Sequence, residues 1–211
     1  MARDPHRTTV ARAVRNPLRK KLLQLRFAPI AFAAALAFAC ADPSPALRAL
    51  GAALVATGLA LRAVAVGHLE KREILTVTGP YAHLRHPLYA GTLLVSLGLA
   101  AVLGGVVAGA VAALTLAWFA ASYFPRKERR ESDVLEARFG GAFAAYRARV
   151  PAVAPALRAY VLPSELARDV PLSSRWSLER YVGNNELGTF LGVALTLALA
   201  WLRTRALLGA P

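Results

Sequence analysis

A continuous apolar run from Leu88 to Phe124 is the feature that most restricts how this chain can fold. A single helix of this length would extend about 55 Å, whereas the hydrocarbon core of a bilayer is only about 30 Å thick. The run therefore has to fold back on itself. Gly104-Gly105 lies near its middle, so we predict a tight helical hairpin that turns at these glycines. Gly105 and Gly109 also form a GxxxG pair, which predicts close helix packing.

Three further apolar runs predict additional membrane helices. They extend from Leu22 to Ala41, from Leu47 to Gly67 and from Leu187 to Leu202, and one crossing needs about 20 residues. The composition agrees, because 56% of the 211 residues are hydrophobic and the mean hydropathy is +0.43. We therefore expect an all-α fold, a polytopic membrane helical bundle of about five transmembrane helices.

The basic residues predict which side of the membrane each polar segment faces. Eight lysines and arginines precede Phe27, and eleven lie between Pro125 and Glu186. Because cytoplasmic segments are enriched in these residues, we expect both regions in the cytoplasm, together with the loop from Glu70 to His86. The two arginines that follow the last apolar run are the exception. The net charge of +14 does not indicate nucleic-acid binding, since no aromatic stacking pattern is interleaved with the basic residues.

Polar side chains gather in front of the hairpin, in Gly79-Pro-Tyr-Ala-His-Leu-Arg-His-Pro-Leu-Tyr-Ala-Gly91. Arg85 and His86 directly precede Pro87, and proline is favoured at the first position of a helix. Both side chains are therefore expected beside a helix N-terminus, whose free N–H groups and dipole favour anions. The segment predicts a small pocket for a carboxylate or phosphate at the membrane surface.

A second polar segment follows the hairpin, where the charged run Arg126–Asp133 leads into a patterned helix. Apolar side chains recur there at steps of three and four, at Leu135, Phe139, Phe143, Tyr146 and Val150. This spacing predicts a cytoplasmic amphipathic helix, which we expect to lie against the bilayer surface. Gly140-Gly141 predicts a bend within it. The alternative interpretation of the charged run is a solvated helical face with Glu–Arg pairs.

Three isolated residues carry weaker signals. Arg62 lies inside an apolar run and must reach the interface or find a partner, so it is a second-tier site candidate for which a structural role is favoured. Cys40 is the only cysteine, allows no internal disulfide and is interpreted as a small packing residue. His83 and His86 are three residues apart, but no further ligand completes a set, so we expect no metal site.

The two polar segments, in this order and spacing, resemble the isoprenylcysteine carboxyl methyltransferase family and its phospholipid methyltransferase relatives. The resemblance covers about Leu61 to Pro155 and rests on the segment from Gly79 to Gly91 and on Glu131-x3-Leu-x3-Phe-Gly-x5-Tyr-x3-Val-Pro151. It implies S-adenosylmethionine as methyl donor, held between these segments at the cytoplasmic face, and a lipophilic acceptor that arrives from the bilayer. Asn184-Asn185-Glu186 resembles a bacterial branch, which implies the bacterial inner membrane.

One position departs from the pattern of that family. The family commonly has two adjacent glutamates before the Phe-Gly pair, whereas this chain has Glu131 followed by Ser132. Glu128 and Asp133 are nearby but do not stand at the matching place. We expect either a lower affinity for the cofactor or another residue that compensates.

The chemistry of S-adenosylmethionine assigns expected roles to the residues of the two segments. Glu131 is expected to accept hydrogen bonds from the ammonium or the ribose hydroxyls, and His86 with the following helix N-terminus to bind the carboxylate. Arg85 is expected to bind that carboxylate or an anionic acceptor. The expected catalytic residues are thus Arg85, His86 and Glu131. The expected cofactor-binding residues are Gly79, Tyr81, His86, Pro87, Tyr89, Gly91, Glu131 and Tyr146. The aromatic members are expected either to flank the adenine or the methyl path, or to anchor the chain at the membrane interface.

We therefore predict one integral-membrane methyltransferase domain over residues 1–211. It comprises a basic cytoplasmic N-terminus (1–21), the core of the resemblance (79–155), a cytoplasmic segment (156–186) and a last membrane helix (187–205). The expected reaction is carboxyl O-methylation of an isoprenylcysteine-like substrate. N-methylation of a phospholipid or small lipid, and a catalytically silent membrane protein that binds a ligand or partner, remain alternatives. The expected partners are the lipid bilayer and a lipophilic or lipidated substrate, without nucleic acid, and the oligomeric state stays open.

Overall fold

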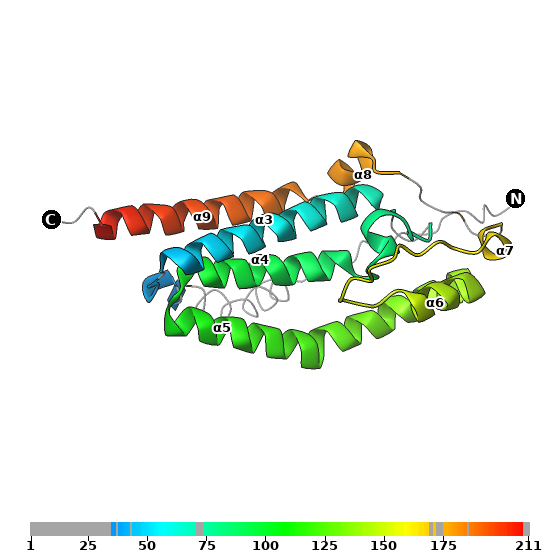
Figure 1. The fold of residues 1–211 in the computed structure, drawn as a ribbon, viewed down its shortest axis with the longest axis horizontal. Helices are drawn as coiled ribbons and strands as arrows, with labels where there is room; N and C mark the ends of the chain where they lie inside the picture. Colours follow the sequence, from blue (N-terminus) through cyan, green and yellow to red (C-terminus); the bar gives the residue numbers. More distant parts are fainter. Residues whose placement is uncertain are drawn as a thin grey trace, which may run out of the picture.

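The computed structural model describes residues 35–36, 38–42, 44–70, 74–168, 171, 175–184 and 186–208. The regular secondary structure of these residues is helical, and they form no strand. A single isolated bridge pairs Asp42 with Gly104. Helices α3, α4, α5 and α9 run lengthwise beside one another, and α6 continues α5 beyond the ends of α3 and α4 (Figure 1). The described part of the chain is therefore an elongated helical bundle with one helix that projects from it.

The long helices follow the predicted apolar runs. They are α3 (Pro45–His68), α4 (Pro87–Leu103), α5 (Gly105–Trp118) and α9 (Leu187–Leu208). A π-helical turn, η2 (Phe119–Tyr123), joins α5 to α6 (Phe124–Arg149) without a break. The short elements are the 3-10 helix η1 (Gly79–Ala82), α7 (Ser164–Ala167) and α8 (Leu178–Gly183).

Three helices in the described ranges are long and apolar enough to cross a membrane. They are Pro45–His68, Leu187–Ala206 and the continuous helix Gly105–Arg149, which is apolar over α5 and charged over α6. The shorter apolar helix Pro87–Leu103 pairs with α5 in the hairpin. A helical membrane protein fits this arrangement. The predicted number of about five spans stays a prediction, because most of the run from Leu22 to Ala41 lies outside the described residues.

The hairpin turns where the sequence predicted. Gly104 and Gly105 have φ angles of 63° and 74°, in the left-handed region that favours glycine. A Cβ atom at Gly105 would also lie 2.9 Å from the Cys40 carbonyl oxygen. Gly109 does not contribute, because no described atom lies within 4 Å of a Cβ built there. Cys40 is exposed. The packing role predicted for Cys40 is therefore wrong, whereas that of Gly109 stays a prediction, because no partner for it lies among the described residues.

Close helix packing occurs instead between α3 and α4, at glycines that the sequence analysis did not select. A Cβ at Gly51 would lie 2.6 Å from the Gly98 carbonyl oxygen, and one at Gly58 would lie 2.7 Å from that of Gly91. The two glycines of α3 are seven residues apart, and so are the two glycines of α4. Each helix therefore presents both of its glycines on one face. The two backbones meet directly at these glycines, as small residues permit between membrane helices.

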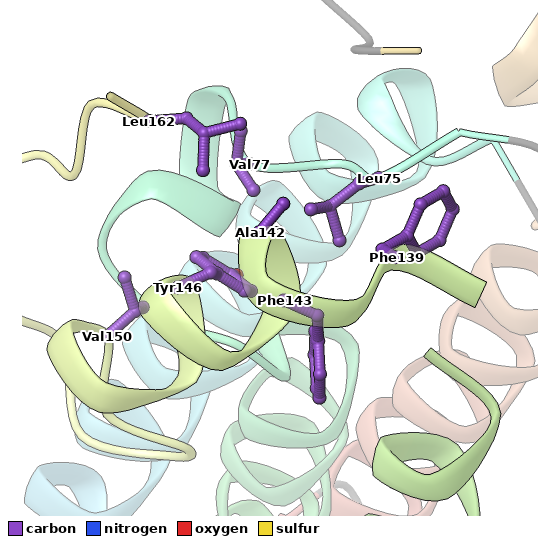
Figure 2. Packing of buried hydrophobic residues seen from close by; sticks show 8 residues of the cluster. All are labelled: Leu75, Val77, Phe139, Ala142, Phe143, Tyr146, Val150 and Leu162. Atoms are coloured by element: carbon purple, nitrogen blue, oxygen red, sulfur yellow. The ribbon is translucent and has the colours of Figure 1, made fainter. Parts of the chain in front are cut away.

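Helix α6 is amphipathic and bent, as predicted, but its apolar face packs against the chain itself. Gly140 interrupts it with φ 47° and ψ −124°. Beyond the bend, Phe143 is only 2% exposed and belongs to a cluster with Leu75, Val77 and Leu162 (Figure 2). The prediction that this face lies against the bilayer surface is therefore wrong. The apolar pattern correctly indicated that this face is buried. It could not indicate what covers the face, because the covering segments are distant in sequence.

Candidate functional site

Backbone hydrogen bonds join the two polar segments that the sequence analysis selected. The amides of Arg85 and His86 donate to the carbonyls of Pro151 and Ala152 at 2.9 and 3.0 Å. In return, the amide of Ala156 donates to the His83 carbonyl, and the His83 ring contacts the Ala156 carbonyl through Nδ1 at 2.8 Å. The segment before α4 is therefore fixed along the segment that follows α6, and His83 has a structural contact.

A cavity of about 600 Å³ lies where these segments meet. This volume is in the range of small-molecule sites. Its wall is mostly apolar and comes from the chain after α3, from η1, from the first turn of α4 and from α6. Six of the predicted cofactor-binding residues line it, namely Tyr81, His86, Pro87, Tyr89, Glu131 and Tyr146. The fold thus brings most of the predicted site residues to one cavity.

His86, Tyr89 and Glu131 form a connected polar group in the wall. The Tyr89 hydroxyl donates to Glu131 Oε1, and His86 Nδ1 lies 3.5 Å from Glu131 Oε2. The His86 ring also stacks on the Tyr89 ring, with centroids 5.4 Å apart. Partial burial opposes ionisation of Glu131, but its hydrogen bonds with His86 and Tyr89 outweigh that effect and hold its pKa below the usual value. Glu131 therefore presents a carboxylate to the cavity at neutral pH.

The second ring nitrogen of His86 is the least satisfied polar atom of this group. His86 Nε2 is buried and has no hydrogen-bond partner among the described residues. A buried polar atom left without a partner costs about 1–3 kcal/mol, so such an atom in a cavity wall favours a polar ligand. Together, His86 and Glu131 offer a donor or acceptor nitrogen and an anionic oxygen to one guest molecule.

Two buried tyrosines hold the wall in place. The Tyr146 hydroxyl donates to the Tyr81 carbonyl oxygen at 2.7 Å, which links α6 to η1. Burial raises the pKa of the Tyr81 phenol, and the nearby Glu131 charge raises it further. Tyr81 is therefore a neutral phenol that faces the cavity.

Three predicted site residues do not line the cavity. Gly79 has φ 58°, and a Cβ there would lie 2.6 Å from the His68 ring. Gly91 packs against α3, where a Cβ would meet Arg62 Cγ at 2.6 Å. The Arg85 guanidinium instead contacts the protein, through Nη1 to Glu128 Oε1 at 2.7 Å and Nε to the Val150 carbonyl at 2.9 Å. Its predicted contact with a cofactor carboxylate finds no support in this geometry.

The cavity also contains charged residues that the sequence analysis did not select. Glu70, Lys127 and Arg130 line it, and Glu70 forms an ion pair with Arg180 at 3.3 Å. Lys127 and Glu131 are four residues apart on α6, and this helical spacing is the signal that would have placed them on one face. Glu70 carried no such signal, because its position depends on how the chain leaves α3.

The Arg62 side chain has an ion-pair partner within the protein, which is one of the two outcomes expected from the sequence. Its guanidinium pairs with Glu186, which is 5% exposed, and also bonds to Thr92 Oγ1 and the Leu88 carbonyl. This contact ties the start of α9 to α3 and α4, next to a cavity-lining residue. The structure thus gives Arg62 the structural role that the sequence favoured. The described residues contain no group of three or more His, Cys, Asp or Glu that could hold a metal ion.

The comparisons with known proteins show a likeness of part of this chain to a methyltransferase. No family model matches the chain, and no solved structure matches it. It is 30% identical over 103 residues to the protein-S-isoprenylcysteine O-methyltransferase of Schizosaccharomyces pombe, covering 49% of this chain and 42% of that protein. It is 38% identical over 91 residues to the cobalt-zinc-cadmium resistance protein CzcN of Cupriavidus metallidurans, covering 43% of this chain and 40% of that protein. The chain therefore spans less than half the length of these curated relatives, one of which is a methyltransferase.

Proposed function

We propose that this chain is an S-adenosylmethionine-dependent methyltransferase that acts on a lipophilic acceptor at the cytoplasmic membrane face. The observation that carries the proposal is the buried Nε2 of His86, which has no hydrogen-bond partner among the described residues and belongs to a side chain that lines, with Glu131, a cavity of about 600 Å³. The partial likeness to the Schizosaccharomyces pombe methyltransferase supports it. The donor set also fits the cofactor, whose amino-acid part carries one cationic and one anionic group.

His86 and Glu131 would hold the two ends of that amino-acid part. The Glu131 carboxylate would accept hydrogen bonds from the ammonium or from the ribose hydroxyls, while His86 Nε2 and the positive N-terminal end of α4 would bind the carboxylate. Tyr89 fixes the Glu131 carboxylate through its hydroxyl. Because Glu131 already has this bond, its orientation is set before a ligand arrives.

The apolar part of the wall would align the reactants and exclude water. When bound, the cofactor supplies an electrophilic methyl group on a sulfonium ion. Leu88, Val134 and Leu135 line the same cavity and offer an apolar surface to a lipophilic acceptor. Methyl transfer is an in-line displacement, so orientation and removal of water supply much of the rate without a covalent enzyme intermediate.

The wall favours an acceptor that carries a carboxylate, as in an isoprenylcysteine-like substrate. Lys127 and Arg130 line the cavity and attract an anionic group. A carboxylate oxygen is already a nucleophile and needs no general base, whereas an amine acceptor must first lose a proton, with His86 or Glu131 as the candidate base. N-methylation of a lipid headgroup is therefore the second candidate. The observation that favours it is that Glu131, a candidate base, lines the cavity.

The test is methyl transfer in membranes that contain the full chain. Membranes are incubated with methyl-labelled S-adenosylmethionine, and lipid and protein fractions are extracted. Base-labile label in a prenylated acceptor supports carboxyl methylation, stable label in lipid supports N-methylation, and cofactor binding without transfer supports the silent alternative. Glu131→Gln should lower transfer by at least about a hundredfold. Glu136→Gln, on the exposed face of the same helix, is the matched control. Equal transfer in both variants would remove Glu131 from the site.

A further inference from the structure

Glu128 does not line the cavity, but it contacts Arg85, which directly precedes the cavity-lining His86. Its Oε1 accepts a hydrogen bond from Arg85 Nη1 at 2.7 Å and one from the Ser132 hydroxyl at 3.3 Å. Its side chain is 14% exposed, and Ser132 is 2% exposed. Glu128 does not line the cavity, whereas Glu131, three residues later on the same helix, does. Glu128 and Glu131, two of the four acidic residues of α6, therefore face different groups: Glu131 faces the cavity, and Glu128 faces Arg85.

Arg85 links the Glu128 carboxylate to the chain at Val150 and Pro151 and, through the backbone, to His86. Its guanidinium bonds to Glu128 near the start of α6 and to the Val150 carbonyl at the end of α6. Its own amide donates to the Pro151 carbonyl, and the next residue is His86. The ion pair thus fixes the position of the segment that carries His86 relative to the helix that carries Glu131. A change in this pair would alter the separation of His86 and Glu131.

The place of Ser132 explains why Glu128 is needed. Ser132 and Glu128 are one helical turn apart and point to the same side of α6, with their oxygens 3.3 Å apart. A carboxylate carried by residue 132 would therefore occupy the volume that the Glu128 carboxylate now fills. The chain lacks an acidic residue at position 132, and the carboxylate that reaches Arg85 comes from one turn earlier.

We propose that Glu128 is a positioning residue that supplies, from one helical turn earlier, the carboxylate missing at position 132, and that it holds Arg85 so that His86 and Glu131 can bind one ligand together. The inference rests on the proposed function for its ligand, S-adenosylmethionine. Its structural half, the exchange of one carboxylate position for another, rests on the contacts of Glu128 with Arg85 and Ser132.

The experiment transfers the carboxylate from position 128 to position 132. The full chain is purified in lipid nanodiscs as wild type, Glu128→Ala, Ser132→Glu and the double variant Glu128→Ala/Ser132→Glu, with Asp133→Ala as an exposed control on the same helix. The measurements are the dissociation constant for labelled S-adenosylmethionine and the thermal unfolding midpoint. We expect Glu128→Ala to weaken binding by at least about tenfold, because it leaves the largely buried Arg85 without its counter-ion. The double variant should recover binding to within about threefold of wild type.

A purely structural role would move other quantities. For a positioning residue, Glu128→Gln should raise KM for S-adenosylmethionine while turnover at saturation stays near wild type, whereas a loss of folded protein alone would lower the apparent turnover and leave KM unchanged. Wild-type binding in Glu128→Ala, or no recovery in a folded double variant, would overturn the proposal. If Glu128→Ala does not fold, Glu128→Gln replaces it, and recovery of folding by the double variant supports the exchange while failure to recover overturns it.

The two proposals fail in different ways. If the wild type binds no S-adenosylmethionine, the proposed function fails. In that case the unfolding midpoints of the four variants still decide whether a carboxylate at position 132 replaces the one at position 128. If the wild type binds but the double variant does not recover, only the positioning role of Glu128 fails.

Discussion

The bundle between α3 and α4 and the region around α6 are stabilised in opposite ways. The first is held by backbone contacts at two glycine pairs, Gly51–Gly98 and Gly58–Gly91, with few polar groups. The second is held by the apolar cluster around Phe143 and, in addition, by hydrogen bonds and ion pairs to loop segments, such as Arg85 with Glu128 and the Val150 carbonyl. In hydrocarbon, helices gain from close approach, whereas at a polar surface side-chain charges can select one arrangement.

This difference shows why the cavity lies where it does. At the glycine pairs the two backbones are in direct contact, whereas the α6 region has side chains that bond to carbonyls and leave one His86 nitrogen unpartnered among the described residues. Arg62, on α3, joins the bundle to the edge of the cavity, since it contacts Glu186 and the carbonyl of the cavity-lining Leu88 on α4. Substitutions in each region should therefore fail in different ways.

The largest expected effect is at that junction. Arg62→Met would leave the Glu186 carboxylate buried without its counter-ion, and breaking a buried pair by removing one partner costs about 3–5 kcal/mol. We expect a large drop in the unfolding midpoint in detergent micelles. The double variant Arg62→Met/Glu186→Leu should recover most of it, and Arg48→Met on the same helix is the control. A double variant less stable than the single one would show that the ion pair is not the cause.

The glycine contacts come next. Gly58→Leu would place a Cβ 2.7 Å from the Gly91 carbonyl oxygen, so the two helices would have to separate. We expect a loss of about 3 kcal/mol in the free energy of unfolding. Gly109→Leu is the matched control, because no described atom lies within 4 Å of a Cβ there. If both variants unfold alike, direct backbone contact is not what stabilises α3 against α4.

The same two regions show what the sequence can predict. The hairpin turn at Gly104-Gly105 and the bend at Gly140 were predicted because both depend on local properties, namely the length of an apolar run and the backbone freedom of glycine. The pairing of Gly51 with Gly98 was not predicted, because a glycine contact depends on which helix lies opposite. For the same reason, the apolar face of α6 was predicted but its covering segments were not.

The candidate site shows a similar limit. The motifs predicted that Tyr81, His86, Tyr89 and Glu131 would lie together, and the structure brings them to one cavity. The motifs also placed Arg85 in the site, although its guanidinium bonds to Glu128. Which of two neighbouring side chains points into a cavity depends on the backbone conformation at the start of α4, and residue identity does not reveal it.

A smaller effect should come from the hydroxyl of Tyr89. Tyr89→Phe removes the hydrogen bond to Glu131 while keeping the ring that stacks on His86. Under the proposed function, we expect S-adenosylmethionine binding to weaken by about tenfold, since hydrogen bonds to charged groups contribute about 1.5–3 kcal/mol. Tyr123→Phe, whose ring lies 6.0 Å from that of Tyr89, is the control. Binding of equal strength in both variants would mean that the orientation of Glu131 does not depend on Tyr89.

The smallest expected effect is a pH dependence in the α6 region that the glycine-packed region lacks. Partial burial opposes ionisation of Glu128, but the hydrogen bond and charge of Arg85 outweigh it, so its pKa in the folded chain lies below the usual value of 4.5. The stabilisation is therefore complete above pH 4.5 and is lost as the pH falls through the lower folded-state pKa. The free energy of unfolding of wild type minus that of Glu128→Gln should be constant near neutral pH and decrease in acid. Gly58→Leu should shift stability equally at every pH, because no titrating group takes part in its contact. A difference for Glu128→Gln that stays constant down to pH values well below 4.5 would show that its carboxylate is not ionically paired with Arg85 or Arg147.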